Sequence, residues 1–162
     1  GGYALMRFSA LLPYLFMFIT TAGIITTAIL CTRQTDLKAL IALSSVSHMN
    51  LVIAATLIQT QWSYTGAMIM MIAHGLTSSA LFCLANTAYE RTNSRTMILL
   101  RGAMLILPMT TAWWVMVLLL NMALPPSLNF YAELLIMASL FNWSTMAFLL
   151  VTLNLVFTTA YT

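Results

Sequence analysis

The stretch from Ala39 to Tyr89 contains no Asp, Glu, Lys or Arg, and this feature limits the possible folds more than any other. Its only basic side chains are those of His48 and His74. A membrane-spanning helix needs about 20 predominantly apolar residues, so the stretch is too long for a single crossing. The polar run Gln-Thr-Gln-Trp-Ser at 59–63 provides a natural turn. The sequence therefore predicts two spans, near 38–58 and 64–86.

The composition extends this interpretation to the whole chain. Of its 162 residues, 62% are hydrophobic and 6% are charged, whereas soluble domains carry about 25% charged residues. These values exclude an ordinary soluble enzyme and a disordered tail. Six scattered Lys and Arg residues make no phosphate-binding patch, and two cysteines make no disulfide framework. The class of protein that remains is an integral membrane protein.

The chain begins with Gly1 rather than Met and stops within an apolar run. The basic, apolar and small segments of a signal peptide are absent from its start. We therefore expect an internal piece of a longer protein, forming a single membrane domain over 1–162.

Three further spans complete the predicted fold, near 14–30, 104–141 and 144–162. The second of these contains Pro125 and Pro126, which cannot lie inside a regular helix without losing backbone donors. Two interpretations fit: two spans joined by a Pro-Pro hairpin, or one span broken at 123–129. The segment after the prolines is too short to cross alone, which favours the broken helix. The predicted fold is all-α, a polytopic transmembrane bundle of about five crossings.

The basic residues predict the orientation of the bundle. With five crossings, all but one of them fall on one side, in the loops 33–38 and 87–101: Arg33, Lys38, Arg91, Arg95 and Arg101. Only Arg7 falls on the other side. The positive-inside rule then places these two loops in the cytoplasm or the mitochondrial matrix.

Glu133 is the one acid inside an expected span, and it lies just after the break. A charged group at a helix centre costs about 2.5–3.5 kcal/mol on insertion scales. Glu133 should therefore be protonated much of the time, face a water-filled cavity, or pair with a base from another helix. A carboxyl that only satisfies the backbone amides of the broken helix is the structural alternative.

Two polar stripes accompany the histidines. Lys38, Ser45 and His48 fall within roughly 80° of arc at about 100° per residue, and Ser44 and Ser47 lie beside them.

His74 is followed by Thr77 and Ser78 on the next helix. Imidazoles among hydroxyls can pass protons, although the same groups also serve as hydrogen-bonded contacts between helices. Lys38 either starts its stripe or extends to the headgroups. Gly66, Gly75 and Gly102 are expected to permit close helix approach.

Several ordered motifs resemble the antiporter-like subunits of respiratory complex I, particularly the mitochondrially encoded ones. They are Ser-Ser-Val-Ser-His at 44–48, Met-Ile-Ala-His-Gly at 71–75, Tyr-Glu-Arg-Thr at 89–92 and Ala-Leu-Pro-Pro-Ser-Leu-Asn at 123–129. The resemblance covers essentially the whole chain. One departure is Ala132, where the family usually has Gly directly before the acid.

The resemblance implies a core membrane subunit of proton-pumping NADH:ubiquinone oxidoreductase in the mitochondrial inner membrane. His48 and His74 would be central relay residues, Glu133 the terminal acid, and Lys38 a lysine at the matrix end of its helix. The chain would bind no cofactor and carry out no redox step, because NADH, FMN, iron–sulfur clusters and ubiquinone belong to other subunits. Its partners would be the other membrane subunits and the lipid bilayer, with no nucleic acid.

Two alternatives remain at the level of the sequence. Large subunits of multisubunit sodium–proton antiporters share these motifs, and a scaffold bundle would use the polar stripes only to hold its helices together. No Gly-rich phosphate loop is present, so energy for pumping has to come from partners.

Overall fold

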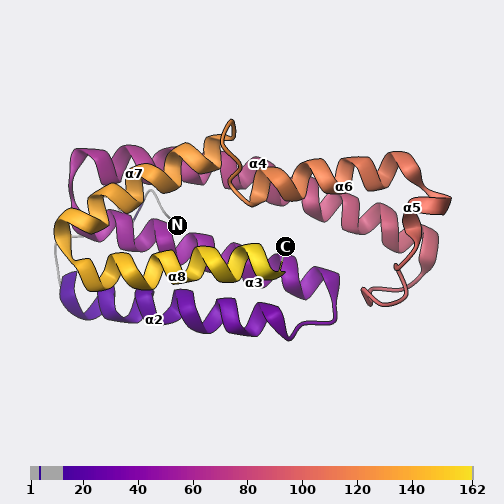
Figure 1. Ribbon diagram of the computed structural model, residues 1–162, viewed down its shortest axis with the longest axis horizontal. Coiled ribbons are helices and arrows are strands. Elements are labelled where there is room, and N and C mark those ends of the chain that lie inside the picture. Colours follow the sequence, from indigo (N-terminus) through magenta and orange to yellow (C-terminus); the bar gives the residue numbers. More distant parts are fainter. Residues whose placement is uncertain (1–3, 5–12, 162) are drawn as a thin grey trace.

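The protein is a bundle of helices, as predicted (Figure 1). The computed structural model describes residue 4 and residues 13–161. The helices are α2 (Pro13–Thr32), α3 (Leu37–Ile58), α4 (Gln61–Thr92), α5 (Ala103–Ile106), α6 (Pro108–Asn121), α7 (Leu128–Trp143) and α8 (Thr145–Tyr161). Helix α3 packs against α2, α4 and α7, so three neighbouring helices bury one side of it.

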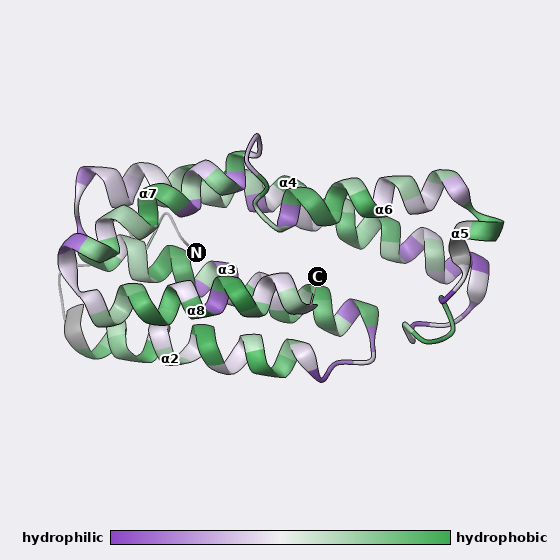
Figure 2. Ribbon diagram, viewed as in Figure 1, coloured by the Kyte–Doolittle hydropathy of each residue, from purple (hydrophilic) through white to green (hydrophobic). Residues whose placement is uncertain are grey.

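Three helices, α2, α3 and α4, are long and apolar enough to cross a membrane, and α6 and α8 are shorter apolar helices. Large hydrophobic side chains cover the outer surface. Figure 2 shows apolar residues along the lengths of the helices and hydrophilic ones mostly at the ends of the bundle. The chain is therefore a multi-pass membrane protein, with large apolar side chains exposed on the outside of the bundle.

The predicted broken helix consists of α6 and α7, which lie one after the other alongside α4 (Figure 1). Pro125 and Pro126 occupy the turn between them, and Ala123 there adopts a left-handed conformation with φ 53°. Across the turn, Asn129 Nδ2 donates to the carbonyl of Leu120 at 3.0 Å. This bond satisfies a carbonyl at the end of α6 that the interrupted helix leaves without its usual partner.

The predicted start of the second basic loop, at residue 87, is wrong, because α4 continues as a helix to Thr92. A side-chain hydrogen bond from Asn86 Nδ2 to Glu90 Oε1 spans one turn at 3.0 Å and supports the helix there. Helix α4 ends at Asn93, a left-handed C-cap with φ 51°. Its 32 residues correspond to about 48 Å, so it extends beyond a hydrocarbon core of about 30 Å.

The span predicted over 104–141 contains a second interruption, at residue 107, in addition to the predicted break. Helix α5 ends at Ile106, and Pro108 begins α6 as a separate helix. Proline lacks the N–H that an inner helical position requires, whereas the first helical turn tolerates it.

The segments around Thr35 and Thr96 join at one end of the bundle. Leu37 N donates to Arg95 O, and Met97 N donates to Thr35 O, both at 3.1 Å. The loops 33–38 and 93–101, which carry most of the basic residues, therefore lie together at what we call the basic end. Arg7, expected at the other end, lies outside the described residues.

Gly66 permits close packing of α4 against α7, as expected. A Cβ atom placed on Gly66 would lie 3.0 Å from Ile136 Cγ1, 3.1 Å from Leu135 Cβ and 3.3 Å from the carbonyl oxygen of Ala132. The expectation fails for Gly75 and Gly102, since no described atom lies within 4 Å of a Cβ placed on either. Ala132 stands where the family usually has glycine, and it is fully buried. The small residue that faces it from α4 is Gly66.

Candidate functional site

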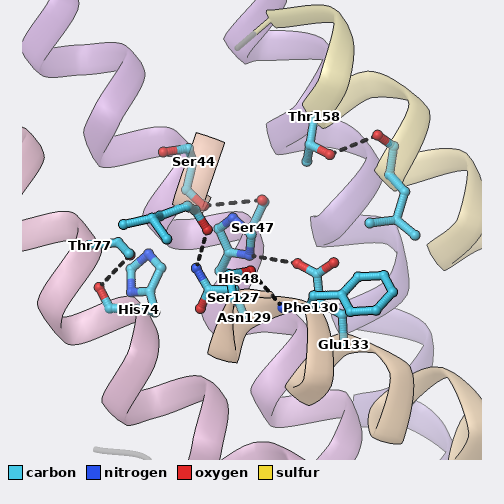
Figure 3. A network of polar contacts seen from close by, with 12 residues as sticks. Ser44, Ser47, His48, His74, Thr77, Ser127, Asn129, Phe130, Glu133 and Thr158 are labelled. Carbon is cyan, nitrogen blue, oxygen red and sulfur yellow. Dashed lines mark hydrogen bonds and ion pairs between the residues drawn. The ribbon is translucent and has the colours of Figure 1, made fainter. Parts of the chain in front are cut away.

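Three ionisable side chains from three helices meet inside the bundle: His48 from α3, His74 from α4 and Glu133 from α7 (Figure 3). His48 Nδ1 lies 3.8 Å from Glu133 Oε1. The His48 and His74 rings have centroids 5.2 Å apart and are tilted by 44°. The structure therefore brings together three of the four residues that the sequence predicted as a proton relay, all except Lys38.

All three are buried, with exposed fractions of 4% for His48, 5% for His74 and 6% for Glu133. The separation of His48 Nδ1 from Glu133 exceeds a direct hydrogen bond, so one water or a small side-chain movement has to complete it. His48 Nε2 is buried and has no hydrogen-bond partner among the described residues. A structural contact would normally satisfy such a group, and this nitrogen therefore distinguishes His48 from a simple packing residue.

Hydroxyl groups follow the buried face of α3 towards His48. Ser44 and Ser47 are buried, with Ser44 Oγ donating to Ile41 O at 2.8 Å and Ser47 Oγ to Ser44 O at 3.1 Å. Ser45 is only half-buried and donates to the Ile41 carbonyl at 3.0 Å. The polar face that leads to His48 therefore runs through Ser44 and Ser47, and Ser45 lies at its margin.

The hydroxyls after His74 are less enclosed. Thr77 Oγ1 donates to the His74 carbonyl at 3.3 Å, and Ser78 Oγ to Gly75 O at 3.4 Å. Both side chains are half-buried. Thr77 lines a cavity of about 250 Å³ beside the helix break, together with Ser127 and Asn129.

Lys38 does not join the buried group. It lies in the first turn of α3, ten positions before His48, which corresponds to about 15 Å along a helix. Its Nζ lies 5.4 Å from the centroid of the Tyr89 ring, and Arg95 Cζ lies 5.0 Å from the same ring. Lys38 therefore belongs to the basic end.

The helix break positions Glu133. Ser127 caps α7 by accepting from Phe130 N at 3.3 Å, and Glu133 follows in the second turn. The close contact between Gly66 and the segment at 132–136 holds this part of α7 against α4. The break thus lets α7 begin inside the bundle and places a carboxyl beside His48.

Three buried asparagines were not singled out from the sequence: Asn121, Asn129 and Asn154. Asn129 is 1% exposed, and Asn129 Oδ1 and Asn154 Oδ1 have no hydrogen-bond partner in the described part of the chain. Glu133 was identified because it is a polar residue inside an apolar span, and an asparagine in such a span gives the same signal. Applying it to Asn121 and Asn154 would have found both.

The arrangement can hold and exchange protons. An imidazole and a carboxyl a few ångströms apart can pass a proton directly or through one water, and a second imidazole lies within reach of the first. Within residue 4 and residues 13–161, no three His, Cys, Asp or Glu side chains form a metal site. The fold and this group define a class: multi-pass membrane proteins with a buried ionisable centre behind a broken helix.

Comparisons with known proteins agree with this class. The model of the transmembrane family of NADH:quinone oxidoreductase and Mrp antiporter subunits matches residues 1–159. NADH-ubiquinone oxidoreductase chain 4 of Struthio camelus is 55% identical over the whole chain, and that of Danio rerio is 52% identical over 99% of it. Chain 4 of Atropoides picadoi is 53% identical over 99% of the chain.

The chain belongs to this family of NADH:quinone oxidoreductase and Mrp antiporter membrane subunits, which confirms the resemblance seen in its motifs. It spans 37% of the Struthio camelus relative and 36% of the Danio rerio relative. For the Atropoides picadoi relative the share is 73%.

Proposed function

We propose that this chain is part of a proton-translocating membrane subunit of NADH:ubiquinone oxidoreductase in the mitochondrial inner membrane. The observation that carries the proposal is the buried group of His48, His74 and Glu133 beside the helix break. The chain 4 relatives support the choice of complex. The partners are the other membrane subunits and the bilayer.

In this proposal, Glu133 and His48 exchange a proton across the gap between Oε1 and Nδ1, and His74 exchanges one with His48. The loops at the basic end face the matrix, in accordance with the positive-inside rule. Moving one charge against 100 mV requires about 2.3 kcal/mol. Electron transfer from NADH to ubiquinone, through FMN and iron–sulfur clusters held by other subunits, supplies that energy.

The Glu133→Gln variant tests the proposal in the full-length subunit assembled in its complex. Glutamine keeps the size and hydrogen bonding of the side chain but cannot carry the proton. We expect fewer protons pumped per NADH oxidised in sealed vesicles, with normal amounts of assembled complex. Glu90→Gln is the matched control, because Glu90 is exposed near the end of α4. Unchanged pumping by an assembled Glu133→Gln complex would remove the carboxyl from the path.

A sodium–proton antiporter subunit is the second candidate, because the matching family also includes Mrp antiporters. A native gel of source membranes, stained for NADH oxidation and probed in a denaturing second dimension, separates the two. An antibody to residues 93–101 should detect a chain well above 17.9 kDa inside the NADH-oxidising band. Detection only in a smaller assembly without that activity would favour the antiporter.

A further inference from the structure

A hollow of about 220 Å³ at the basic end combines two cations with apolar side chains. Arg91, near the end of α4, and Arg101, just before α5, both line it, and both are exposed. Neither arginine forms an ion pair with any described residue. Glu90, the acid next to Arg91, instead accepts a hydrogen bond from Asn86. The hollow therefore presents two arginines that have no counter-charge in the described part of the chain.

The remaining lining of this hollow is mostly apolar. Leu99 and Ile106 line it and are 69% and 80% exposed, and Leu105, next to Ile106, is 92% exposed. Large apolar side chains exposed together mark a contact with a membrane or a partner. Because they adjoin two arginines here, the hollow suits a ligand that has both an anionic group and a hydrocarbon part.

The hollow continues into an apolar groove along α6. A narrow space of about 40 Å³ shares Arg91 and Leu107 with the hollow and leads to Thr111. Thr111 also lines a groove of about 600 Å³, which is bounded by apolar residues of α6 and by the turn at 124–127. Figure 1 shows α6 leading from α5 to that turn. The three spaces therefore form one path from the arginines to the helix break.

The length of this path favours a lipid chain as its occupant. Helix α6 has 14 residues, which correspond to about 21 Å. A hydrocarbon core of about 30 Å contains two leaflets, each about 15 Å deep. A partner helix that crosses the membrane would need a groove along the whole thickness, whereas this groove ends at Ser127. Its length therefore matches an acyl chain of one leaflet.

We propose that this path binds an anionic phospholipid from the leaflet at the basic end. The lipid phosphate lies between Arg91 and Arg101, and one acyl chain extends along α6 to Pro126. Guanidinium groups bind phosphate through charge-assisted hydrogen bonds, and basic pockets between membrane helices bind anionic headgroups. The proposal goes beyond proton transfer and does not depend on it, because it requires only a bundle embedded in a membrane.

Photocrosslinking in the native assembly of the full-length subunit tests the site. The probe is phosphatidylglycerol with a diazirine at the end of one acyl chain, added to the assembly in phosphatidylcholine nanodiscs. Peptide mass spectrometry should locate adducts at residues 115–126, which form the far end of the groove. A phosphatidylcholine probe with the same diazirine should label these residues several-fold less. Equal labelling by the two probes, or no adduct at 115–126, would overturn the proposal.

Arginine variants test the headgroup site. Arg101→Gln should lower the adduct yield about fivefold at limiting probe, as expected for the loss of one arginine near an anionic lipid. Arg33→Gln is the matched control, because Arg33 is exposed at the basic end and does not line the hollow. Equal losses in both variants would show only the general attraction of the basic end and would overturn the site.

The groove is tested separately from the arginines. Met116→Trp should abolish the adducts by filling the groove, whereas Met109→Trp should not, because Met109 is exposed on α6 outside it. Excess inorganic phosphate should not displace the probe, since it has no chain to occupy the groove. Displacement by phosphate would indicate an anion site without a lipid. A protein helix in the groove in a cryo-electron microscopy map of the assembly would also overturn the proposal.

Discussion

At His48, the two ring nitrogens have different surroundings. Nδ1 lies 3.8 Å from Glu133 Oε1, whereas Nε2 has no partner among the described residues. His74 contributes a second ring 5.2 Å away. A pair of histidines that only held helices together would be expected to use its nitrogens in hydrogen bonds. The unused nitrogen favours a relay over a packing contact.

At the residue scale, we predict that His48→Ala combined with His74→Ala impairs coupling more than assembly. Pumping per NADH should fall clearly, because no imidazole remains to pass the proton to or from Glu133. The amount of complex on a native gel should stay within about twofold of the unmodified level. Loss of the assembled complex with normal coupling in the remainder would indicate that the histidines serve packing.

At the scale of single helices, the close packing of α4 against α7 determines where Glu133 lies. Gly66 supplies the space, and the nearest neighbours of a Cβ placed there include the carbonyl of Ala132. A backbone group cannot move aside as a flexible side chain can. Small displacements of α7 therefore change the distance from Glu133 to His48.

Gly66→Ala should destabilise the protein by about 1–3 kcal/mol, as overpacking usually does. The measurement is the melting temperature of the full-length subunit in its complex, together with its pumping. Gly75→Ala is the matched control in the same helix. It should be neutral or stabilising by about 0.5–1 kcal/mol, because alanine favours a helix over glycine. Equal melting temperatures for both variants would contradict the close contact at Gly66.

The break between α6 and α7 depends on Asn129, whose amide bonds the Leu120 carbonyl at 3.0 Å. Asn129→Leu should cost about 0.5–1.5 kcal/mol, since it removes one hydrogen bond from the Leu120 carbonyl, to which Ala123 N still donates at 3.4 Å. The same melting measurement checks this. Leu128→Ala, at the exposed neighbouring position, should have a smaller effect, and the reverse order would show that the bond does not stabilise the break.

At the scale of the whole molecule, the joined segments at 35–37 and 95–97 gather the basic residues at one end. This agrees with a charge asymmetry that sets orientation. Tyr89 also holds the two segments together, because the cationic groups of Lys38 and Arg95 both lie over its ring. The turn between α3 and α4, around Gln59 and Thr60, lies at the other end of those two helices.

We predict that an antibody to residues 93–101 binds inverted inner-membrane vesicles and not intact mitoplasts. An antibody to residues 59–62 should show the opposite pattern, since that turn is exposed at the other end of α3 and α4. Labelling of both vesicle types by immunogold or flow measurement checks this. Binding of the first antibody to mitoplasts would reverse the proposed orientation.

The sequence by itself determined the helical membrane fold and the break at the Pro-Pro pair, and it predicted that His48, His74 and Glu133 lie within spans. These follow from local chemistry: apolar runs require burial in lipid or protein, and proline interrupts a helix wherever it occurs. The ends of the helices do not follow from the apolar runs alone. Helix α4 continues beyond its apolar run, where the hydrogen bond from Asn86 to Glu90 supports it. The start of α6 also depended on Pro108 rather than on hydrophobicity.

The tertiary structure alone decided which of these residues meet. His48 and Glu133 lie far apart along the chain, and their contact depends on how α3, α4 and α7 pack. The same packing directs Ser44 rather than Ser45 inward and leaves Lys38 at the basic end. Helical periodicity gives the relative directions of side chains on one helix, but only the neighbouring helices determine which of those directions faces the interior.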